Sequence, residues 1–200
     1  MVDQAQAPQG AAPRRGRPRS ADTDRRILAA GLELLRAGGP RAVTVEAVSE
    51  ASGVAKTTIY RRYADRHELL GAALKDAIGT PGEPPAAEPR EKIRWALDQT
   101  WQQMSDVLGP GGLAAIIGDT DRRFTDGFRR ILLPYTDALV ALIHEDIAAG
   151  QLRSDLDADA TVSLMVGAYL GELLRRGTVD ADFTDECIHL LWVAMSIGKK

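Results

Sequence analysis

The sequence predicts an all-α protein with a small N-terminal head and a larger C-terminal helical domain, about nine helices in all. Apolar residues recur at intervals of three and four along most of the chain, which is the spacing of one helix face. No segment shows the alternation of apolar and polar residues that a half-buried strand needs. A Pro/Gly-rich stretch, GTPGEPPAAEP at residues 79–89, interrupts the helical pattern and divides the two parts.

The composition is that of a globular protein, because 44% of the residues are hydrophobic and 26% are charged. No apolar run approaches the roughly 18 residues of a membrane span, and the N-terminus lacks an apolar leader segment, so we expect a cytoplasmic protein. Cys187 is the single cysteine, which fits a reducing compartment, and we interpret it as a small buried side chain.

The charge is distributed unevenly, although the net charge is only −3. Residues 1–80 hold 13 basic and 9 acidic side chains, a net charge of +4, whereas residues 81–200 hold 12 and 19, a net charge of −7. A basic N-terminal part is compatible with a polyanionic partner such as DNA.

Residues 1–20 are expected to form a flexible basic arm. The first thirteen residues are rich in Ala, Gln and Pro and show no periodic apolar pattern. The arginines that follow, interleaved with Gly16 and Pro18, resemble basic arms that enter the minor groove of DNA. A solvated basic tail is the alternative. The arm candidates are Arg14, Arg15, Arg17 and Arg19.

The head, residues 21–78, begins with a helix predicted over 22–37 and ended by Gly38-Gly39-Pro40. Two short helices follow. Thr44 is a plausible N-cap of the first, whose apolar face is expected to hold Val45, Val48 and Ala51. Gly53 permits a tight bend, and Val54 with Ile59 fills the angle between the helices. This spacing predicts a helix-turn-helix that reads DNA.

The outward side chains of this unit are nearly all hydrogen-bond donors. In a helix-turn-helix the second helix enters the major groove, so its exposed residues are candidates for base edges, while flanking residues contact phosphate. The base-reading candidates are Lys56, Thr57, Thr58 and Arg61. The phosphate candidates are Thr44, Tyr60, Tyr63 and Arg66.

Residues 22–75 resemble the DNA-binding end of the tetracycline-repressor-like (TetR) family of bacterial regulators. The resemblance rests on Gly53-Val54, Thr58-Ile59-Tyr60, Tyr63, Asp65-Arg66 and Glu68-Leu69-Leu70. The departures from the usual pattern are small: Ser49 for Ala, Ala55 for Ser or Thr, Tyr63 for Phe and Arg66 for Lys. The resemblance implies a homodimer that binds double-stranded DNA and a small-molecule effector in the bacterial cytoplasm, associated with the nucleoid.

A fourth helix starts at a capping-box-like pair, Asp65 and Glu68, and is followed by the linker, residues 79–90. The C-terminal domain, residues 91–200, then begins with a helix whose apolar stripe ends at Gly109-Pro110-Gly111-Gly112. A short apolar helix over 113–118 and a long helix that runs to Gly150, with a kink expected at Pro134, complete its first half.

Residues 151–160, QLRSDLDADA, carry aspartates at alternate positions, as a calcium-binding loop does. Such a loop, counted from Asp155, also needs Gly at its sixth position and Glu at its twelfth, but these positions hold Ala160 and Val166. We interpret them as a polar turn in which Asp157 or Asp159 caps the next helix.

The last two helices, predicted at about 158–175 and 183–197, are the most apolar of the chain. Because the final helix is apolar nearly all round, it needs cover on more than one side, and a second copy of the chain could supply that cover. A central core helix is the alternative. The candidates for the dimer seam are Leu164, Leu190, Leu191, Trp192 and Met195.

The C-terminal domain also concentrates aromatic and long aliphatic side chains with few charges among them. Such a set suits an apolar small-molecule pocket between helices, or simply an ordinary core, and the family resemblance favours the effector pocket. The candidates are Trp95, Trp101, Met104, Phe124, Phe128, Tyr135, Met165 and Tyr169.

No pattern in the sequence indicates an enzyme. His67, His144 and His189 are scattered, without a His or Cys partner at metal-ligand spacing, and neither a nucleophile motif nor a phosphate-binding loop is present. We therefore expect no catalytic residue, no metal and no cofactor. The sequence favours a ligand-responsive repressor on a palindromic operator; the alternative is an effector- or protein-binding module that no longer reads DNA.

Overall fold

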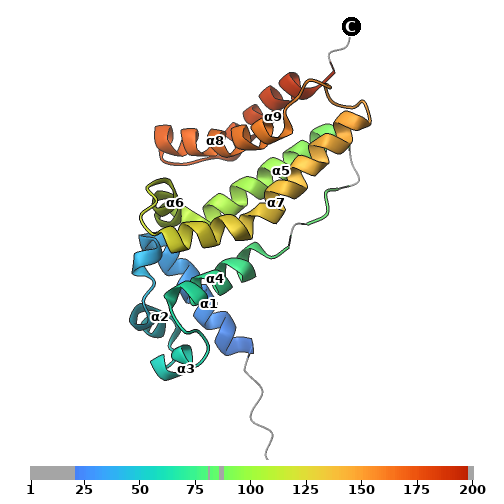
Figure 1. Cartoon of the computed structure of the whole chain (residues 1–200). Helices are drawn as coiled ribbons and strands as arrows, with labels where there is room; N and C mark the ends of the chain where they lie inside the picture. The colour runs from blue at the N-terminus through green and yellow to red at the C-terminus, as the bar shows by residue number, and fades with distance from the viewer. Residues whose placement is uncertain (1–20, 81, 86–87, 198–200) are drawn as a thin grey trace, which may run out of the picture.

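A computed structural model describes residues 21–80, 82–85 and 88–197, and these residues form an elongated helical molecule without strands (Figure 1). The all-α prediction is confirmed. The helices are α1 (Ala21–Gly38), α2 (Val45–Ser52), α3 (Lys56–Tyr60), α4 (Arg66–Ile78), α5 (Pro89–Gln102), α6 (Gly109–Ile117), α7 (Arg122–Ala148), α8 (Ala158–Arg176) and α9 (Ala181–Met195), with a 3-10 turn at Pro40–Ala42 and a π-helical segment at Gln103–Leu108.

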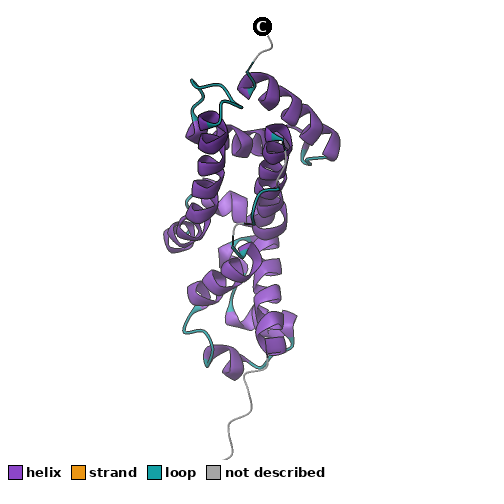
Figure 2. Ribbon diagram, turned by 90° about the vertical axis from the view of Figure 1, so that its right-hand side faces the viewer, coloured by secondary structure: helices purple, strands orange, loops and turns teal. Residues whose placement is uncertain are grey.

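Helices α1 to α4 form the head at one end of the molecule, and α8 and α9 lie at the other end (Figure 1). The head has its own apolar core, in which Ile27 and Leu35 of α1 and Ile59 of α3 are completely buried. Figure 2 shows the same elongated form from the side, with the short helices of the head at one end. The head therefore presents α2 and α3 away from the C-terminal domain.

Several helices start where the sequence predicts, because a side chain accepts a hydrogen bond from a free backbone amide. Thr44 accepts from the Ala47 amide, Asp65 from the His67 and Glu68 amides, and Asp157 from the Ala160 amide. Glu68 in turn accepts from the amide of Ala64, the residue before the N-cap, at 2.6 Å, which resembles a capping box at the start of α4.

The predicted apolar face of α2 is correct for Val48, which is buried, and for Val45, which packs against the core, but wrong for its last residue. Ala51 is exposed, whereas Ser52 is buried, with its hydroxyl accepting a hydrogen bond from the Val54 amide at 3.2 Å. The chain bends directly after α2, and this bend places Ser52, the last residue of α2, in the core. Helical spacing alone therefore gives the wrong buried residue in the last turn of α2.

The helical region that begins with α5 ends at Leu108, with Gly109 as its C-cap, as the sequence predicts; the next helix, α6, starts at Gly109 rather than at the expected residue 113. Gly109 has φ of 57°, which turns the chain between the π-helical segment and α6. Gly111 lies against the end of α1, where a β-carbon would be 2.4 Å from the Gly39 amide nitrogen and 2.7 Å from the Leu35 carbonyl oxygen. Glycine here permits backbone contact between the head and the C-terminal domain.

In the C-terminal domain α5 contacts α8 and α9, and α7 contacts α8, so that α8 and α9 lie at the end of the molecule opposite the head (Figure 1). Leu97 of α5, Met165 of α8 and Ile188 of α9 are buried in the shared core. Pro134 lies inside the 27-residue helix α7, as the sequence predicts. None of the described helices combines the length and the apolar character needed to cross a membrane.

Candidate nucleic-acid interface and ligand pocket

The bend between α2 and α3 is fixed by local packing. Gly53 adopts the left-handed conformation with φ of 65°, and Val54 and Ile59 fill the angle between the helices, 7% and 0% exposed. The Ser49 hydroxyl donates to the Val54 carbonyl at 2.8 Å, and the Arg26 guanidinium donates to the Ser52 carbonyl. These contacts hold α3 at a defined angle to α2.

Three of the four base-reading candidates, Lys56, Thr57 and Arg61, are exposed, and Thr58 is half-buried. Helix α3 has only five residues, and Arg61 is its C-cap residue. Lys56 forms an exposed ion pair with Glu46 of α2 at 3.1 Å. The Lys56 hydrogen bond is the main cause that lowers the pKa of the Glu46 carboxyl.

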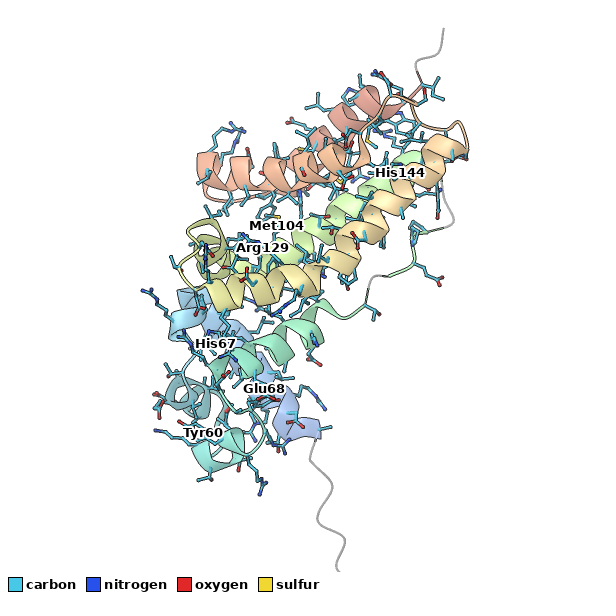
Figure 3. The ribbon with its side chains drawn as sticks, viewed as in Figure 1. Tyr60, His67, Glu68, Met104, Arg129 and His144 are labelled. Atoms are coloured by element: carbon cyan, nitrogen blue, oxygen red, sulfur yellow. The ribbon has the colours of Figure 1, made fainter. Side chains whose placement is uncertain are left out.

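The phosphate candidates are placed differently from one another. Tyr60 is 56% exposed at the tip of the head (Figure 3). Thr44 is exposed, although its hydroxyl caps α2. Tyr63 is half-buried, and burial raises the pKa of its phenol. Arg66 is turned toward the C-terminal domain, where it pairs with Asp121 at 2.6 Å, so its predicted contact with phosphate would compete with this ion pair.

The arm candidates Arg14, Arg15, Arg17 and Arg19 lie outside the described residues.

Asp121, the N-cap residue of α7, joins α7 to the first turn of α4. It accepts hydrogen bonds from Arg66 at 2.6 Å and the Phe124 amide at 3.2 Å, and it lies 3.2 Å from His67 Nε2. Burial opposes its ionisation, but these partners together hold the pKa of Asp121 below its usual value. Arg123 adds an exposed ion pair to Asp65 at 2.8 Å. Figure 3 shows His67 at this junction of head and C-terminal domain.

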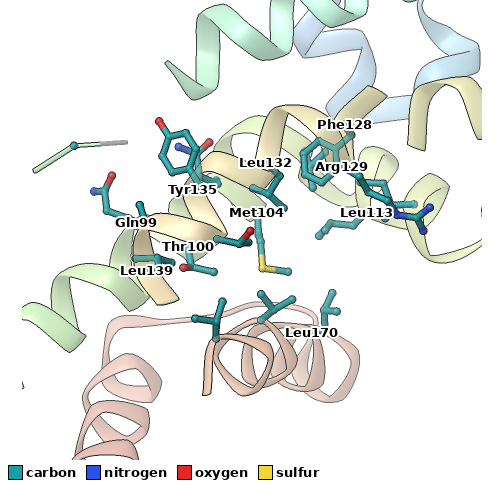
Figure 4. A pocket seen from close by; sticks show the side chains of 18 of the residues that line it. Gln99, Thr100, Met104, Leu113, Phe128, Arg129, Leu132, Tyr135, Leu139 and Leu170 are labelled. Atoms are coloured by element: carbon teal, nitrogen blue, oxygen red, sulfur yellow. The ribbon is translucent and has the colours of Figure 1, made fainter. Parts of the chain in front are cut away.

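A cavity of about 290 Å³ lies between α5, α6, α7 and α8 (Figure 4). Four of the predicted pocket residues, Trp95, Met104, Phe128 and Tyr135, line it. The Tyr135 hydroxyl donates a hydrogen bond to the Ile78 carbonyl at the end of α4. A residue of the cavity wall therefore contacts the head directly.

The other four predicted pocket residues belong to the core beside the cavity. Trp101 is stacked on Phe183, with ring centroids 5.6 Å apart, and donates from Nε1 to the Met165 carbonyl at 2.9 Å. Tyr169 packs edge-on against Trp101 at 5.8 Å, and Phe124 is buried beside Phe128. Helical spacing identifies buried faces but does not distinguish those that pack tightly from those that border a cavity.

Sequence reasoning missed most of the polar lining of the cavity. These side chains are isolated polar residues among apolar neighbours, so no motif marks them. They are Gln99, Thr100, Gln103, Arg129 and Thr136.

The predicted seam is partly exposed in the single chain. Leu164 of α8 and Leu190 of α9 are 65% and 67% exposed, while Leu191 and Trp192 are half-buried. Met195 is only 1% exposed, so it belongs to the core and its assignment to the seam was wrong. Its side chain faces inward because α9 buries Cys187, Ile188 and Met195 on one face.

Within the described ranges, no group of three or more His, Cys, Asp or Glu side chains is arranged to hold a metal ion. The thiol of Cys187 is buried, and this burial raises its pKa.

Residues 27–73 match the family model described as bacterial regulatory proteins, tetR family. The HTH-type transcriptional regulator YdeS of Bacillus subtilis (strain 168) is 26% identical over 174 residues, covering 82% of this chain and 84% of YdeS. The HTH-type transcriptional repressor KstR of Rhodococcus jostii (strain RHA1) is 37% identical over 84 residues, 40% of each chain.

Solved structures share the fold. FadR of Bacillus subtilis, in complex with stearoyl-CoA, superposes with a TM-score of 0.66 at 18% identity, over 84% of this chain and 96% of FadR. TylP, a TetR regulator of Streptomyces fradiae, superposes with a TM-score of 0.68 at 22% identity, over 90% and 89% of the two chains.

The helix-turn-helix head joined to a helical domain with an internal cavity defines a DNA-binding transcriptional regulator. The head matches the tetR family model over residues 27–73, and the chain shares its fold with TylP, a TetR regulator.

Proposed function

We propose that this regulator is a repressor that binds a palindromic operator as a homodimer and is released when a small, mainly apolar effector enters the cavity. The observation that carries the proposal is that α7 both lines the cavity and contacts α4 at its two ends. Asp121 pairs with Arg66 at the start of α4, and Tyr135 donates to the Ile78 carbonyl at its end. A shift of α7 would thus change the position of the head.

On the DNA side, α3 of each subunit would lie in a major groove, with the two half-sites about 34 Å apart. Lys56, Thr57, Thr58 and Arg61 would contact base edges, and a basic side chain such as Lys56 suits guanine O6 and N7. Thr44, Tyr60 and Tyr63 would contact phosphate. The arm, residues 1–20, would add minor-groove contacts through its four arginines.

On the effector side, release needs only a modest energetic difference between two arrangements of the dimer. A coupling free energy of about 1 to 3 kcal/mol changes the affinity for DNA about 5 to 150-fold. The complex of FadR with stearoyl-CoA supports an effector with a large apolar part, and KstR, named a repressor, supports repression. This regulation would take place in the bacterial cytoplasm, on the nucleoid.

The homodimer would form through α8 and α9. Leu164, Leu174, Leu190 and Val193 are all more than 60% exposed on these two helices. A second copy related by two-fold symmetry would cover this surface and hold the two heads at a fixed distance. The chain would then act as three distinct units. These are the head, residues 21–78, the linker, residues 79–90, and the effector and dimerisation domain, residues 91–200.

The test is fluorescence anisotropy of the full chain on DNA from upstream of its own gene and on scrambled DNA, over a series of salt concentrations. We expect tighter binding to the upstream DNA and a steep dependence on salt. Lys56→Ala should weaken specific binding by about tenfold or more, and non-specific binding much less.

Lys75→Ala is the matched control, because Lys75 is an exposed lysine in the last turn of α4, outside the helix-turn-helix. Equal losses on both DNAs would exclude base reading by Lys56. Equal and weak binding of the unaltered chain to upstream DNA and to operators selected from random DNA would favour a module that does not read sequence.

A further inference from the structure

The cavity wall contains very little charge. Among its lining residues only Arg129 is charged, and Arg129 is exposed and lies 3.5 Å from Asp126 on its own helix. In Figure 4 its guanidinium lies beside Leu113, at the opposite end of the lining from Gln99. A charged group deep in this cavity would have no ionic partner, and burying an unpaired charge is strongly unfavourable.

Gln103 supplies a buried polar atom that lacks a partner. It is the first residue of the π-helical segment and lines the cavity, and its amide oxygen is buried without a hydrogen bond. Buried amide groups in proteins are nearly always paired, and π-helical segments are frequent at functional sites. A ligand group is one means by which this oxygen could be satisfied.

The hydroxyl groups of the threonines in the wall already donate hydrogen bonds to backbone carbonyls, so toward a ligand they can only accept. The Thr100 hydroxyl donates to the Ala96 carbonyl at 2.8 Å, and the Thr136 hydroxyl donates to the Leu133 carbonyl at 2.9 Å. Together with the oxygen of Gln103, they make a wall with acceptors that are free to pair. Such a wall favours a ligand that donates.

We propose that the effector is an uncharged, mainly apolar molecule with a terminal hydroxyl group that donates to the amide oxygen of Gln103. If the oxygen and nitrogen of the Gln103 amide exchange places, the ligand hydroxyl can still form a hydrogen bond with it, because a hydroxyl both donates and accepts. The apolar part lies against Met104, Leu132 and Leu139, which line the same cavity (Figure 4). This inference deepens the proposed function and rests on the cavity being the effector site.

The test compares three probes that share a ten-carbon chain and differ only at one end: decanol, decanoate and decane. Binding to the full chain is measured without DNA by the change in tryptophan fluorescence, to which Trp95 in the cavity wall contributes, and by the shift in melting temperature. We expect decanol to bind about tenfold more tightly than either of the others, as one hydrogen bond to a buried neutral group implies.

Gln103→Met keeps the length of the side chain and removes the hydrogen bond, so it should abolish the preference for decanol over decane. Gln102→Met is the matched control, because Gln102 is the exposed neighbour and does not line the cavity. It should leave the preference unchanged, and melting curves show whether both variants fold.

Tighter binding of decanoate, lost in Arg129→Gln, would overturn the proposal in favour of an anionic ligand held at the rim. Absence of saturable binding by any probe, or a preference for decanol that survives Gln103→Met, would also overturn it. Because none of these measurements uses DNA, their outcome is separate from that of the anisotropy test.

Discussion

Arg66 donates to Asp121 at 2.6 Å, and this contact joins the first residue of α4 to the N-cap residue of α7. His67 adds a second contact to the same carboxylate at 3.2 Å. Asp121 is 8% exposed at its side chain and Arg66 is 35% exposed, so the pair is partly protected from solvent. The head is thus attached to the helix that lines the ligand cavity.

Asp121→Asn should destabilise the protein by about 1 to 2 kcal/mol, less than a fully buried ion pair because Arg66 is partly solvated. Asparagine retains helix capping, so the loss reports the ionic contacts. The pKa of Asp121 is lowered from its ordinary 3.8. Its stabilisation is therefore present above about pH 3.8 and is lost as the pH falls through the lowered pKa.

Urea unfolding of both proteins between neutral and acidic pH measures this difference. Asp119→Asn is the control, because Asp119 forms an exposed pair with Arg122 and has φ of 46°, which asparagine tolerates. A stability difference for Asp121→Asn that stays constant down to the lowest pH would show that the carboxylate charge is not responsible.

Tyr135→Phe removes the hydroxyl that donates to the Ile78 carbonyl and leaves the ring in the cavity wall. We expect the amides in the last turn of α4 to exchange hydrogen about fivefold faster, since one net hydrogen bond contributes about 1 kcal/mol. Hydrogen exchange followed by mass spectrometry measures this. Tyr169→Phe should leave α4 unchanged, because Tyr169 packs against Trp101 away from α4. Unchanged exchange in Tyr135→Phe would show that the hydroxyl does not hold α4.

Leu190→Asp should convert the proposed dimer into a folded monomer, because it places a charge on an apolar surface that a partner would bury. Leu190 is 67% exposed, so the substitution should not disturb the fold of the single chain. Sedimentation velocity gives the mass. Leu133→Asp, at a 53% exposed position of α7, is the control and should remain dimeric. A dimer that persists in Leu190→Asp would place the seam on another surface.

Gly111→Ala should destabilise the protein by about 1 to 3 kcal/mol, because its β-carbon would overlap the backbone of Gly39 and Leu35. Gly127→Ala is the control: a β-carbon at Gly127 meets nothing within 4 Å, and alanine inside α7 should add about 0.5 to 1 kcal/mol. Thermal unfolding compares the two variants. Equal effects would mean that the α1 and α6 backbones can separate without cost.

The sequence predicted the features that depend on neighbours along the chain. Thr44, Asp65 and Asp157 cap helices through amides two or three residues away, and Gly53 and Ile59 shape the bend within one short segment. These contacts are local, so their patterns appear in the sequence directly.

Features that depend on distant segments were missed or misread. The partner of Arg66 is 55 residues away, so nothing near Arg66 indicates it. Trp101 and Met104 share one helical stripe, yet Trp101 packs in the core and Met104 borders the cavity, because the distinction depends on what faces them. The glycines at 109–112 do follow a helix end, but the sequence does not show that they also start α6 or that Gly111 meets the backbone of Gly39 and Leu35.

The meeting of Gly111 with Gly39 bears on how hybrid regulators can be built from this chain. The head and the C-terminal domain contact each other through main-chain atoms at this point. If either domain is replaced, substituting side chains cannot restore this backbone contact. A foreign head grafted at the linker would keep α6 but lose its counterpart at the end of α1. Functional chimaeras should therefore carry over the last turn of α1 together with the native α6, and replace only the residues of α2 and α3 that face outward.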